Sequence, residues 1–497
     1  MPSSKKYKIL FVTSEVLPFM KTGGLADVSS ALTQKLTEMG HQVRIVVPKY
    51  GSIDERKYKI HEVVRLKDLK TSIGDKEVTF SLRSSFLVGS KARVQIYFLD
   101  NMEYFVSRHS LYDDPLTGEE FKDNDERFIL LNKSIFELIQ KLGWIPDIIH
   151  VNDWQCSLIP AYLKTVYKNN ELFQSIKTIL TIHNIVYQGV FPKSTFAKTG
   201  LPDQLASEKG IMQGTKVNFL KAGIQYADII NTVSTTYAKE IVNEKELGYG
   251  LHDLLLKRKK DIYGIINGID ETVWNPEKDK LIAKNYSAKN ISDKLENKKA
   301  LCENFDISAD ENVPVIGIIS KLTEPKGFDL LQKAFPEIAK MNVRVILLGT
   351  GERKYQKYFE DYAAKHPDKL SCFIGYDEKL AHLIEAGSDM LLIPSKTEPC
   401  GLNQMYSLVY GTVPIVHKTG GLADTVTNFT EKNQEGNGFV FDKYDPKELV
   451  KEIKRAVELF GRDKAMWAKL VKNGMKSTFS WADSTKHYCE LYKKLAD

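Results

Sequence analysis

The heptapeptide Lys-Thr-Gly-Gly-Leu-Ala-Asp occurs twice in this chain, at residues 21–27 and again at residues 418–424. Each copy follows a short apolar run and precedes a segment with helical periodicity. A Gly-Gly pair at that place lets the backbone approach a ligand closely, and the new helix presents unpaired N–H groups and the positive end of its dipole. Each copy is therefore a candidate anion cradle. A glycine pair also suits a tight turn without a ligand, so one copy could be purely structural.

Two lysines, Lys321 and Lys326, follow the apolar run 315–319 in the sequence SKLTEPKG. Two cations five residues apart at a strand-to-helix turn can clamp a diphosphate and neutralise the charge that grows on a leaving phosphate. A lone surface lysine is usually only solvated, but the position of this pair at the end of an expected strand favours a function.

A carboxylate, Glu398, follows the apolar run 390–393. At the carboxyl edge of a strand it can hydrogen-bond sugar hydroxyls or balance a developing positive charge. The backbone N–H groups of Cys400, Gly401 and Leu402 are expected to open the next helix and to point the same way. The alternative is a glutamate that merely favours the dipole of that helix.

The residues His183 and Asp153-Trp154 follow two other apolar runs, 178–182 and 148–151. A histidine at a strand end can be a general base, a hydrogen-bond donor or part of the core. An aromatic face beside a carboxylate suits a sugar ring, which is apolar above its plane and hydroxylated at its edge.

Several common catalytic patterns are missing from the sequence. There is no GxGxxG dinucleotide motif, no P-loop, no GxSxG elbow, no HExxH and no clustered Cys/His set. Dinucleotide, triad-hydrolase and zinc chemistry are therefore disfavoured. The remaining cations, glycine turns, carboxylate and histidine favour transfer of a group from a phosphorylated donor.

Short apolar runs alternate with longer helical segments along the whole chain, which is typical of parallel strands covered on both faces by crossover helices. The pattern restarts after a glycine-containing junction at residues 264–270, so we expect two doubly wound α/β domains with ligands at the carboxyl ends of strands. The segment 78–88 alternates differently and is expected to form a β-hairpin insertion without a function. The expected strands are 9–12, 43–47, 94–99, 148–151, 178–182 and 229–233, then 315–319, 343–348, 371–374, 390–393, 413–416 and 438–441.

Length and composition agree with two or more globular domains. The chain has 497 residues, beyond the roughly 250–300 at which single cores stop growing. Its formal charge of +6 is spread over 70 basic and 64 acidic residues, so nucleic acid is not an expected partner. The five cysteines are odd in number and form no CxxC, and no apolar run reaches the length of a signal core or a membrane span. We expect a cytoplasmic protein without a membrane partner.

Taken together, the motifs resemble those of bacterial glycogen synthases and plant starch synthases. They lie in order along nearly the whole chain: KTGGLADV at 21–28, NDW at 152–154, HN at 183–184, YQG at 187–189, NGID at 267–270, LT at 322–323, KG at 326–327, EPCGL at 398–402 and TGGLADTV at 419–426. The resemblance implies a GT-B fold, in which two Rossmann-like domains face each other across a deep cleft. It also implies retaining transfer of glucose from ADP-glucose to the non-reducing end of an α-1,4-glucan, extending glycogen without a cofactor or a metal.

The same resemblance implies roles for individual residues. Lys21 would approach the donor phosphates, and Lys321 and Lys326 would clamp the diphosphate. His183 would contact the donor glucose, and Glu398 would hold its hydroxyls. Further donor contacts are implied for Gly23, Gly24, Asn267, Cys400, Gly401, Leu402, Thr419 and Gly420, and contacts to the acceptor or the cleft for Asp27, Asp153, Trp154, Gln155 and Asn184.

The chain departs from the family pattern at two positions. Lys321 stands where the family usually has Arg, so a point charge replaces a bidentate fork. Gln155 stands where a His commonly follows Asp-Trp. Tyr406 stands where related GT-B families carry a second Glu, which this family lacks. Without a carboxylate pair, a covalent glucosyl-enzyme has no nucleophile, and front-face transfer is favoured.

The expected domains are an acceptor-side domain at 1–262, a donor-side domain at 263–478, and a C-terminal helix at 479–497 that returns to the first domain. A hinge is expected near residues 264–270. The alternatives are a UDP-glucose-dependent GT-B glucosyltransferase, a sugar-nucleotide epimerase, and a glucan-binding protein that has lost turnover. A phosphorylase is disfavoured, since that family is much longer and no motif for its lysine-bound pyridoxal phosphate is present. The oligomeric state is left open.

Overall fold

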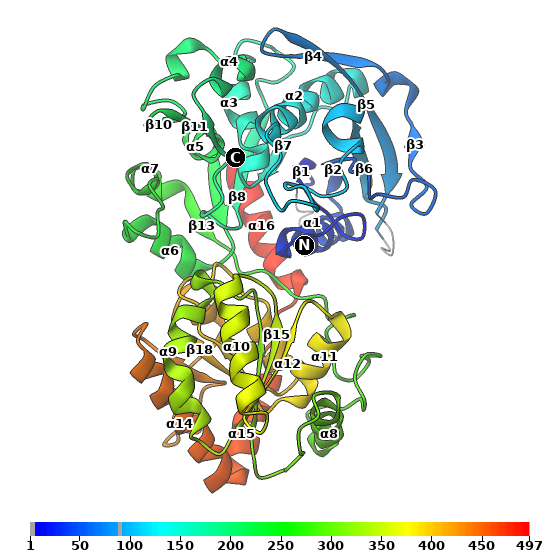
Figure 1. Cartoon of the computed structure of the whole chain (residues 1–497). Coiled ribbons are helices and arrows are strands. Elements are labelled where there is room, and N and C mark those ends of the chain that lie inside the picture. Colours follow the sequence, from blue (N-terminus) through cyan, green and yellow to red (C-terminus); the bar gives the residue numbers. More distant parts are fainter. Residues whose placement is uncertain (1–4, 88–91, 497) are drawn as a thin grey trace. The chain divides into compact units, whose positions relative to one another are not determined.

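The computed structural model describes residues 5–87 and 92–496 and divides into two compact α/β units (Figure 1). Unit 1 consists of Met1–Val233, Ala238–Gly268 and Trp481–Asp497, and unit 2 of Ser234–Tyr237 and Ile269–Ser480. Residues 1–4, which belong to the segment expected to carry no export signal, lie outside the described residues. No helix in the described ranges is both long enough and apolar enough to cross a membrane.

Unit 1 is built on a ten-stranded sheet. Its strands are β1 (Lys8–Val12), β2 (Gln42–Pro48), β3 (His61–Glu62), β4 (Leu69–Ile73), β5 (Lys76–Phe86), β6 (Gln95–Asp100), β7 (Ile148–Asn152), β8 (Lys177–Ile182), β12 (Ile229–Thr232) and β13 (Ile262–Gly264). The order is β13-β12-β8-β7-β1-β2-β6-β5-β3, with β4 paired to β5. The pairs from β13 to β6 are parallel. A separate three-stranded sheet contains β9 (Val190–Pro192), β10 (Met212–Gln213) and β11 (Lys216–Asn218).

The helices of unit 1 include crossover helices between the parallel strands. They are α1 (Gly24–Glu38), α2 (Asn124–Leu142), α3 (Leu158–Lys164), α4 (Thr195–Thr199), α5 (Phe219–Tyr226), α6 (Thr235–Asn243, whose first residues belong to unit 2), α7 (His252–Lys257) and α16 (Trp481–Ala496).

In the segment expected to be a hairpin, 78–88, residues 78–86 belong to a single long strand. Strand β5 pairs antiparallel with β4 along residues 76–80 and with β6 along residues 81–86, and β3 pairs with it at residues 83–84. The expected antiparallel insertion is therefore present, but residues 78–86 form one strand of it and not a strand pair. Val88 lies outside the described residues.

Unit 2 is a second parallel sheet. Its strands are β14 (Val315–Ile319), β15 (Arg344–Gly349), β16 (Leu370–Ile374), β17 (Met390–Ile393), β18 (Val413–His417) and β19 (Phe439–Phe441), in the order β16-β15-β14-β17-β18-β19. Its helices are α8 (Lys294–Asn304), α9 (Phe328–Ala339), α10 (Arg353–Lys365), α11 (Glu378–Gly387), α12 (Asn403–Val409), α13 (Gly420–Thr425), α14 (Pro446–Arg462) and α15 (Lys464–Met475).

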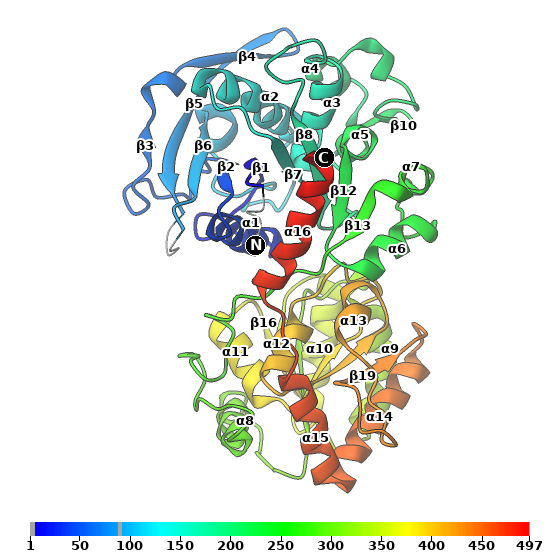
Figure 2. The same ribbon diagram turned by 180° about the vertical axis from the view of Figure 1, so that it is seen from behind.

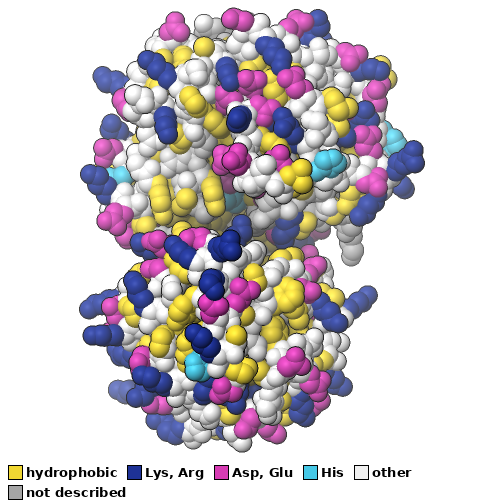
Figure 3. Space-filling view, in the orientation of Figure 1, with side chains coloured by type: hydrophobic (Ala, Val, Ile, Leu, Met, Phe, Trp, Pro, Cys, Tyr) yellow, Lys and Arg dark blue, Asp and Glu magenta, His cyan; other side chains and the backbone are white. Residues whose placement is uncertain are grey.

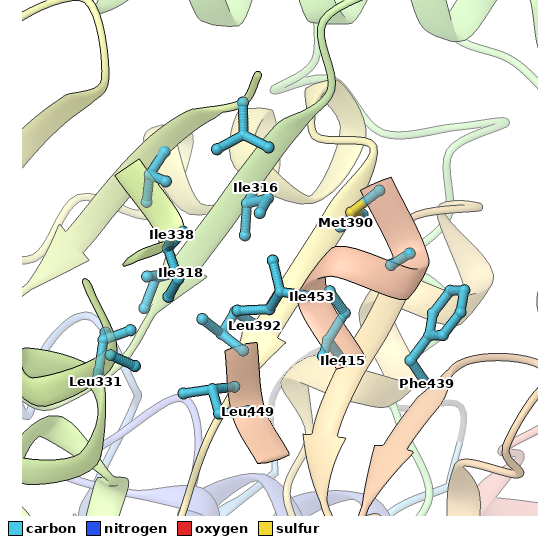
Figure 4. Close-up of a cluster of buried hydrophobic side chains, with 14 of the residues drawn as sticks. Ile316, Ile318, Leu331, Ile338, Met390, Leu392, Ile415, Phe439, Leu449 and Ile453 are labelled. Carbon is cyan, nitrogen blue, oxygen red and sulfur yellow. The ribbon is translucent and has the colours of Figure 1, made fainter. Parts of the chain in front are cut away.

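The core of unit 2 shows why its strands are continuous apolar runs. Ile316 and Ile318 of β14 point to one face of the sheet, where they pack with side chains of α9 and α14 such as Leu331 and Leu449 (Figure 4). Val315 belongs to a different cluster together with side chains of α8 and α11. Because successive side chains of a strand point to opposite faces, a strand covered on both sides must be apolar at every position.

The C-terminal helix α16 packs within unit 1 (Figure 2). The Tyr492 hydroxyl lies 2.8 Å from His150 Nδ1 on β7, and the Tyr488 hydroxyl accepts a 3.1 Å hydrogen bond from Asn231 on β12. The C-terminal segment thus completes a unit whose sheet begins almost at the other end of the chain.

The boundaries between the units differ by a few residues from the expected ones. A break after residue 262 would cut β13, which pairs with β12 through Gly264 and so belongs to unit 1. Apart from Ser234–Tyr237, which belong to unit 2, the chain changes unit between Gly268 and Ile269 and again between Ser480 and Trp481. The reason for the second shift is a backbone bridge between Ile269 and Ser480, which keeps residues 479 and 480 in unit 2.

Candidate functional site

The chemistry-bearing residues of unit 2 gather at the carboxyl ends of three neighbouring strands. Strand β14 leads into the turn with Lys321 and Lys326, β17 into the segment with Glu398, and β18 into Thr419 and Gly420. Because carboxyl ends of parallel strands share one edge, these separate segments meet there.

The central contact of this edge joins Lys326 to Glu398. Lys326 Nζ lies 2.8 Å from Oε1 and 2.6 Å from Oε2 of Glu398, and Ser395 Oγ donates to Oε2 at 2.9 Å. Glu398 is buried, whereas a third of the Lys326 side chain is exposed. An ammonium group has three donors, so one N–H of Lys326 remains for a ligand. The sequence reasoning assigned the two residues separately and missed their ion pair.

Lys321 has a different environment. It is exposed, and no ion pair to it is found within residues 5–87 and 92–496. It lies five residues before Lys326 in the same turn, so unit 2 presents one cation held by a carboxylate and another surrounded by solvent.

The segment Cys400–Leu402 precedes helix α12, which begins at Asn403 rather than within the segment as expected. The backbone carbonyls of Cys400 and Gly401 accept from the Gln404 side chain at 3.0 and 2.9 Å. The N–H groups of Gly401 and Leu402 donate no hydrogen bond in the described part of the chain. Two unused donors therefore follow Glu398, although they lie before the helix and not in its first turn.

The second heptapeptide copy supports the Glu398 segment. Gly420 has φ +43°, and a Cβ on it would lie 2.0 Å from the Glu398 carbonyl oxygen. The Gly421 N–H donates to that oxygen at 3.0 Å. This copy is not an open anion cradle, because a carbonyl of the chain itself occupies it, and Thr419 and Gly420 are buried.

Tyr406, at the position of a second Glu in related families, belongs to a column of three stacked rings. Its ring lies 3.9 Å from that of Trp274, which lies 3.8 Å from the ring of His382. The Asp279 carboxylate lies 2.7 Å from His382 Nδ1 and accepts from the Tyr410 hydroxyl at 2.6 Å. The position is therefore part of the packed interior of unit 2.

In unit 1 the candidate residues lie at the carboxyl ends of β1, β7 and β8. Asp153 follows β7 with φ +52°, and its Oδ1 accepts from the His183 N–H at 2.7 Å. Burial raises the pKa of Asp153 to about 7, despite hydrogen bonds from the backbone at His183 and Asn184 that favour its charged form. The structure thus brings the Asp153 and His183 turns together.

The His183 ring is uncharged at neutral pH, because burial lowers its pKa to about 3. Its Nε2 lies 3.0 Å from Asn152 Oδ1, and Asn152 Nδ2 donates to the Val12 carbonyl at 3.0 Å. The amide orientation makes Oδ1 an acceptor, so Nε2 carries the proton and Nδ1 is left as an acceptor. His183 is thus suited to accept a hydrogen bond from a hydroxyl.

Trp154 does not offer an open aromatic face in unit 1, contrary to our expectation. Its ring is 8% exposed and packs edge-on against Phe128 and Phe191. A Cβ on Gly189 would lie 2.2 Å from the indole, so the turn after β8 covers that ring. The preference of a large aromatic side chain for the core explains the difference.

Gln155 is also buried and is held by a tyrosine that the sequence reasoning missed. Its Nε2 donates to the Tyr112 hydroxyl at 2.8 Å, and Tyr112 also lies 2.9 Å from Ser14 Oγ. Gln155 Oε1 has no hydrogen-bond partner in the described part of the chain. Gln155, which stands where the resembled family usually has His, therefore has one acceptor atom, Oε1, without a partner among the described residues.

The first heptapeptide copy is more open than the second. Lys21 Nζ lies 2.9 Å from Asp27 Oδ2, with 46% of the lysine side chain exposed, and Gly24 is exposed. The N–H groups of Thr22 and Gly23 point to the carboxylate of Glu15. This copy, too, binds an oxygen of the chain itself.

The two remaining residues that the sequence predicted for the site are Asn184 and Asn267. Asn184 Oδ1 accepts from the Val186 N–H at 3.1 Å, which fixes the turn after His183. Asn267 lies one residue before the end of the second segment of unit 1, and its Oδ1 has no partner in the described ranges.

The sequence reasoning overlooked Tyr112 and Glu15, and it also overlooked Tyr376. Tyr376 follows β16 at the same sheet edge of unit 2 as Lys326 and is 78% exposed. A tyrosine two residues after the expected strand 371–374 was a signal that the sequence offered. Tyr112 gave no such signal, because it lies in a long polar loop.

Figure 3 shows lysine and arginine side chains interspersed with aspartate and glutamate on the visible face of each unit. The mixed surface agrees with the weak net charge and shows no broad basic stripe on that face. Among the described residues, no group of three or more His, Cys, Asp or Glu side chains is placed to hold a metal ion.

Comparison with known families finds two matches that together cover most of the chain. Residues 8–257 match the family described as starch synthase catalytic domain, and residues 303–475 match the family described as glycosyl transferases group 1. The matched ranges lie on either side of the junction between the two units.

Full-length relatives carry the name glycogen synthase. One from Thermosipho africanus is 43% identical over 494 residues, with 98% of this chain and 99% of the relative covered. Another from Geotalea daltonii is 43% identical over 486 residues, with 98% of each covered.

Among solved structures, the chain is similar to the catalytic domain of starch synthase IV from Arabidopsis thaliana bound to ADP and acarbose. The TM-score is 0.88 at 31% identity, covering 99% of this chain and 100% of the other. Sucrose-phosphate synthase from Thermosynechococcus elongatus matches with a TM-score of 0.58 at 16% identity, a likeness of fold alone. These matches confirm the predicted GT-B fold class.

Proposed function

The chain belongs to the starch and glycogen synthase family of glycosyltransferases and has glycogen synthase activity, and from this premise we propose that its donor is ADP-glucose. The proposed reaction transfers glucose, with retention of the anomeric configuration, to the non-reducing end of an α-1,4-glucan. The starch synthase IV structure with ADP and acarbose supports this choice of donor and acceptor.

The observation that carries the proposal is the Lys326–Glu398 pair at the strand edge of unit 2. A carboxylate fixed by an ammonium and by Ser395 has lone pairs left for sugar hydroxyls. The third N–H of Lys326, the Lys321 ammonium and the free N–H groups of Gly401 and Leu402 then provide donors for a diphosphate. Sugar and phosphate recognition would lie side by side.

In the proposed reaction, the bond between the glucose C1 and the β-phosphate oxygen breaks first, and the electron pair leaves with the phosphate. The positive charges of Lys321 and Lys326 stabilise the diphosphate as its charge increases. The acceptor hydroxyl attacks C1 from the same face, and its proton passes to the departing phosphate oxygen. Tyr406, stacked in the interior, occupies the position of the second Glu of related families, so we propose no covalent glucosyl-enzyme.

In unit 1, we propose that the residues bind and orient without exchanging a proton. Neutral His183 accepts a hydroxyl hydrogen bond at Nδ1, while its backbone N–H is held by Asp153. Lys21, exposed on its loop, adds positive charge for the donor phosphates. Gln155 Oε1 is a free acceptor for a sugar hydroxyl.

The remaining assignments are proposals of the same kind. Tyr376, exposed at the edge of unit 2, suits stacking with the donor base. With these cationic and amide groups assigned to the diphosphate, we propose neither a metal nor a cofactor. A cytoplasmic location is supported by five free cysteines. We expect neither nucleic acid nor a membrane as partner.

The test is incorporation of labelled glucose into glycogen by the purified chain, with ADP-glucose and UDP-glucose in parallel. We expect incorporation and stoichiometric nucleotide release with ADP-glucose, and at least about tenfold lower kcat/KM with UDP-glucose. The new linkage should be cleaved by an α-1,4-specific amylase. A preference for UDP-glucose would refute the donor, and donor binding without incorporation would point to a glucan-binding protein.

A further inference from the structure

Glu15, in the loop between β1 and α1, is a buried carboxylate that none of the roles above uses. It is 3% exposed, and its Oε2 accepts from the Thr22 N–H at 2.5 Å, from Thr22 Oγ1 at 2.8 Å and from the Gly23 N–H at 3.4 Å. Three donors from the residues after Lys21 therefore converge on one oxygen. One of the two backbone donors belongs to Gly23, which the sequence predicted to contact the donor.

No cation balances this carboxylate. No ion pair to Glu15 is found within residues 5–87 and 92–496, and the nearby Lys21 pairs with Asp27 instead. The titratable groups that face Glu15 are Asp27 on α1, Tyr50 after β2, Tyr112 and Asp153 after β7.

Burial raises the pKa of Glu15, while hydrogen bonds from Thr22 and Gly23 lower it, and the charge of Asp27 raises it. Hydrogen bonds to a charged acceptor are roughly twice as strong as those to a neutral one. The loop with Lys21 is therefore held more firmly when Glu15 is ionised than when it is protonated.

We propose that Glu15 is a positioning residue for the transfer reaction: its carboxylate fixes Thr22 and Gly23, and so sets where Lys21 and the start of α1 meet the donor phosphates. The inference rests on the proposed function of Lys21. It also changes the role of the first Gly-Gly copy, since the Thr22 and Gly23 amides bind Glu15 and the donor meets the Lys21 side chain.

The proposal has kinetic consequences that a purely structural glutamate would not have. Acidification should raise the KM for ADP-glucose as Glu15 takes up a proton, with kcat changing less. The variant Glu15→Gln keeps an acceptor oxygen without the charge and should resemble the acid form at every pH. The variant Thr22→Val removes one hydrogen-bond donor to the ionised Glu15 carboxylate, which raises the pKa of Glu15. The rise in KM on acidification should therefore begin at a higher pH.

The experiment measures kcat and KM for ADP-glucose, with saturating glycogen, from about pH 5 to about pH 8. For Glu15→Gln we expect the KM to be raised about five- to tenfold, with kcat changed less than about threefold. The KM of this variant should not change further as the pH is lowered. Glu15→Asp keeps the charge and should retain part of the pH dependence. The matched control is Asp125→Asn, another buried carboxylate of unit 1, bonded to Thr195 and Lys198.

The control should unfold at lower temperature without changing the KM or its pH profile. If Glu15→Gln lowers only the unfolding temperature, like the control, the inference is wrong. If Glu15→Gln does not fold, the pH dependence of the wild-type KM tests the inference instead. A wild-type KM for ADP-glucose that stays constant on acidification, while the enzyme is still folded, also refutes the inference. Absence of glucose transfer by the wild type would instead refute the proposed function.

Discussion

The two copies of Lys-Thr-Gly-Gly-Leu-Ala-Asp have the same seven residues and each begins a helix, but their glycines face different surroundings. In the second copy a Cβ on Gly420 would meet the Glu398 carbonyl at 2.0 Å, whereas on Gly23 the nearest atom would be Glu15 Oε1 at 3.7 Å. Helix α1 has 15 residues and α13 has 6. The first copy is a loop held by a carboxylate, and the second supports the segment that contains Glu398.

A repeated motif therefore determines a strand-to-helix turn but not the group that the turn binds. Both turns present N–H groups, and in both an oxygen of the chain itself accepts from them. What differs is the acceptor: a titratable carboxylate for the first copy and a backbone carbonyl for the second. Of these two acceptors, only the Glu15 carboxylate can change its protonation state.

The largest expected effect concerns the pair that the second copy supports. Lys326→Ala removes both the partner of Glu398 and a diphosphate donor, and we expect kcat to fall about 100- to 1,000-fold. Steady-state incorporation of labelled glucose measures it. Lys340→Ala, an exposed lysine of unit 2 paired with Glu337, is the control and should be unchanged. Normal turnover in Lys326→Ala would refute the assignment.

Matched alanines in the two copies test the comparison directly. Gly420→Ala adds a Cβ against the Glu398 carbonyl at a positive φ, so Glu398 must move, and a shift of about 1 Å costs on the order of 100-fold in kcat. Gly23→Ala meets only ordinary contacts, and we expect less than about a threefold change.

Turnover and thermal unfolding of both glycine variants are the measurements. Equal losses of activity in the two would show that the donor approaches Gly23 as closely as the Glu398 segment approaches Gly420. The two copies would then be alike in function, and the comparison would fail.

The lysines of the two copies should also differ. Lys21→Ala removes the positive charge that we assign to the donor phosphates, and we expect the KM for ADP-glucose to rise about tenfold. Lys418 pairs with exposed Asp442, and Lys418→Ala should change the KM less than twofold, since exposed pairs contribute little. If Lys418→Ala raised the KM more than Lys21→Ala, the second copy and not the first would be the one that meets the donor.

The smallest expected effect is on stability. Asp424, the last residue of the second copy, accepts from the N–H groups of Thr235 and Thr236 at the start of α6. Asp424→Ala leaves those donors unpaired, at a cost of about 1 kcal/mol, or about 2–4 °C in Tm. Asp27→Ala breaks an ion pair with the partly exposed Lys21, and we expect it to shift Tm less. Calorimetry of both variants checks the order.

Much of the fold could be predicted from the sequence, because a strand buried on both faces is apolar at every position. Ile316 and Ile318 face one helix layer and Val315 the other, so this strand reads as one unbroken run. The sheet edge that carries Lys326 and Glu398 followed from the same pattern, since both residues lie in the segments that follow such runs.

The rest of the site depends on contacts between distant segments, which local pattern does not encode. The Lys326–Glu398 pair joins residues 72 positions apart, and Gln155 and Tyr112 are 43 apart. Trp154 has the residue type of a sugar platform, and only packing by Phe128 and Phe191 shows that it is interior. Glu15 was hidden because a buried carboxylate without a cation is unusual.

The stacked column of His382, Trp274 and Tyr406 limits which side chain fits at position 406. Tyr406→Glu would introduce the carboxylate that related families carry, but it would place a charge against the Trp274 ring, 3.9 Å away, and lose a stacked pair. The substitution would therefore destabilise unit 2 before it could supply a second carboxylate. Adding that carboxylate requires the neighbouring rings of Trp274 and His382 to be redesigned with it.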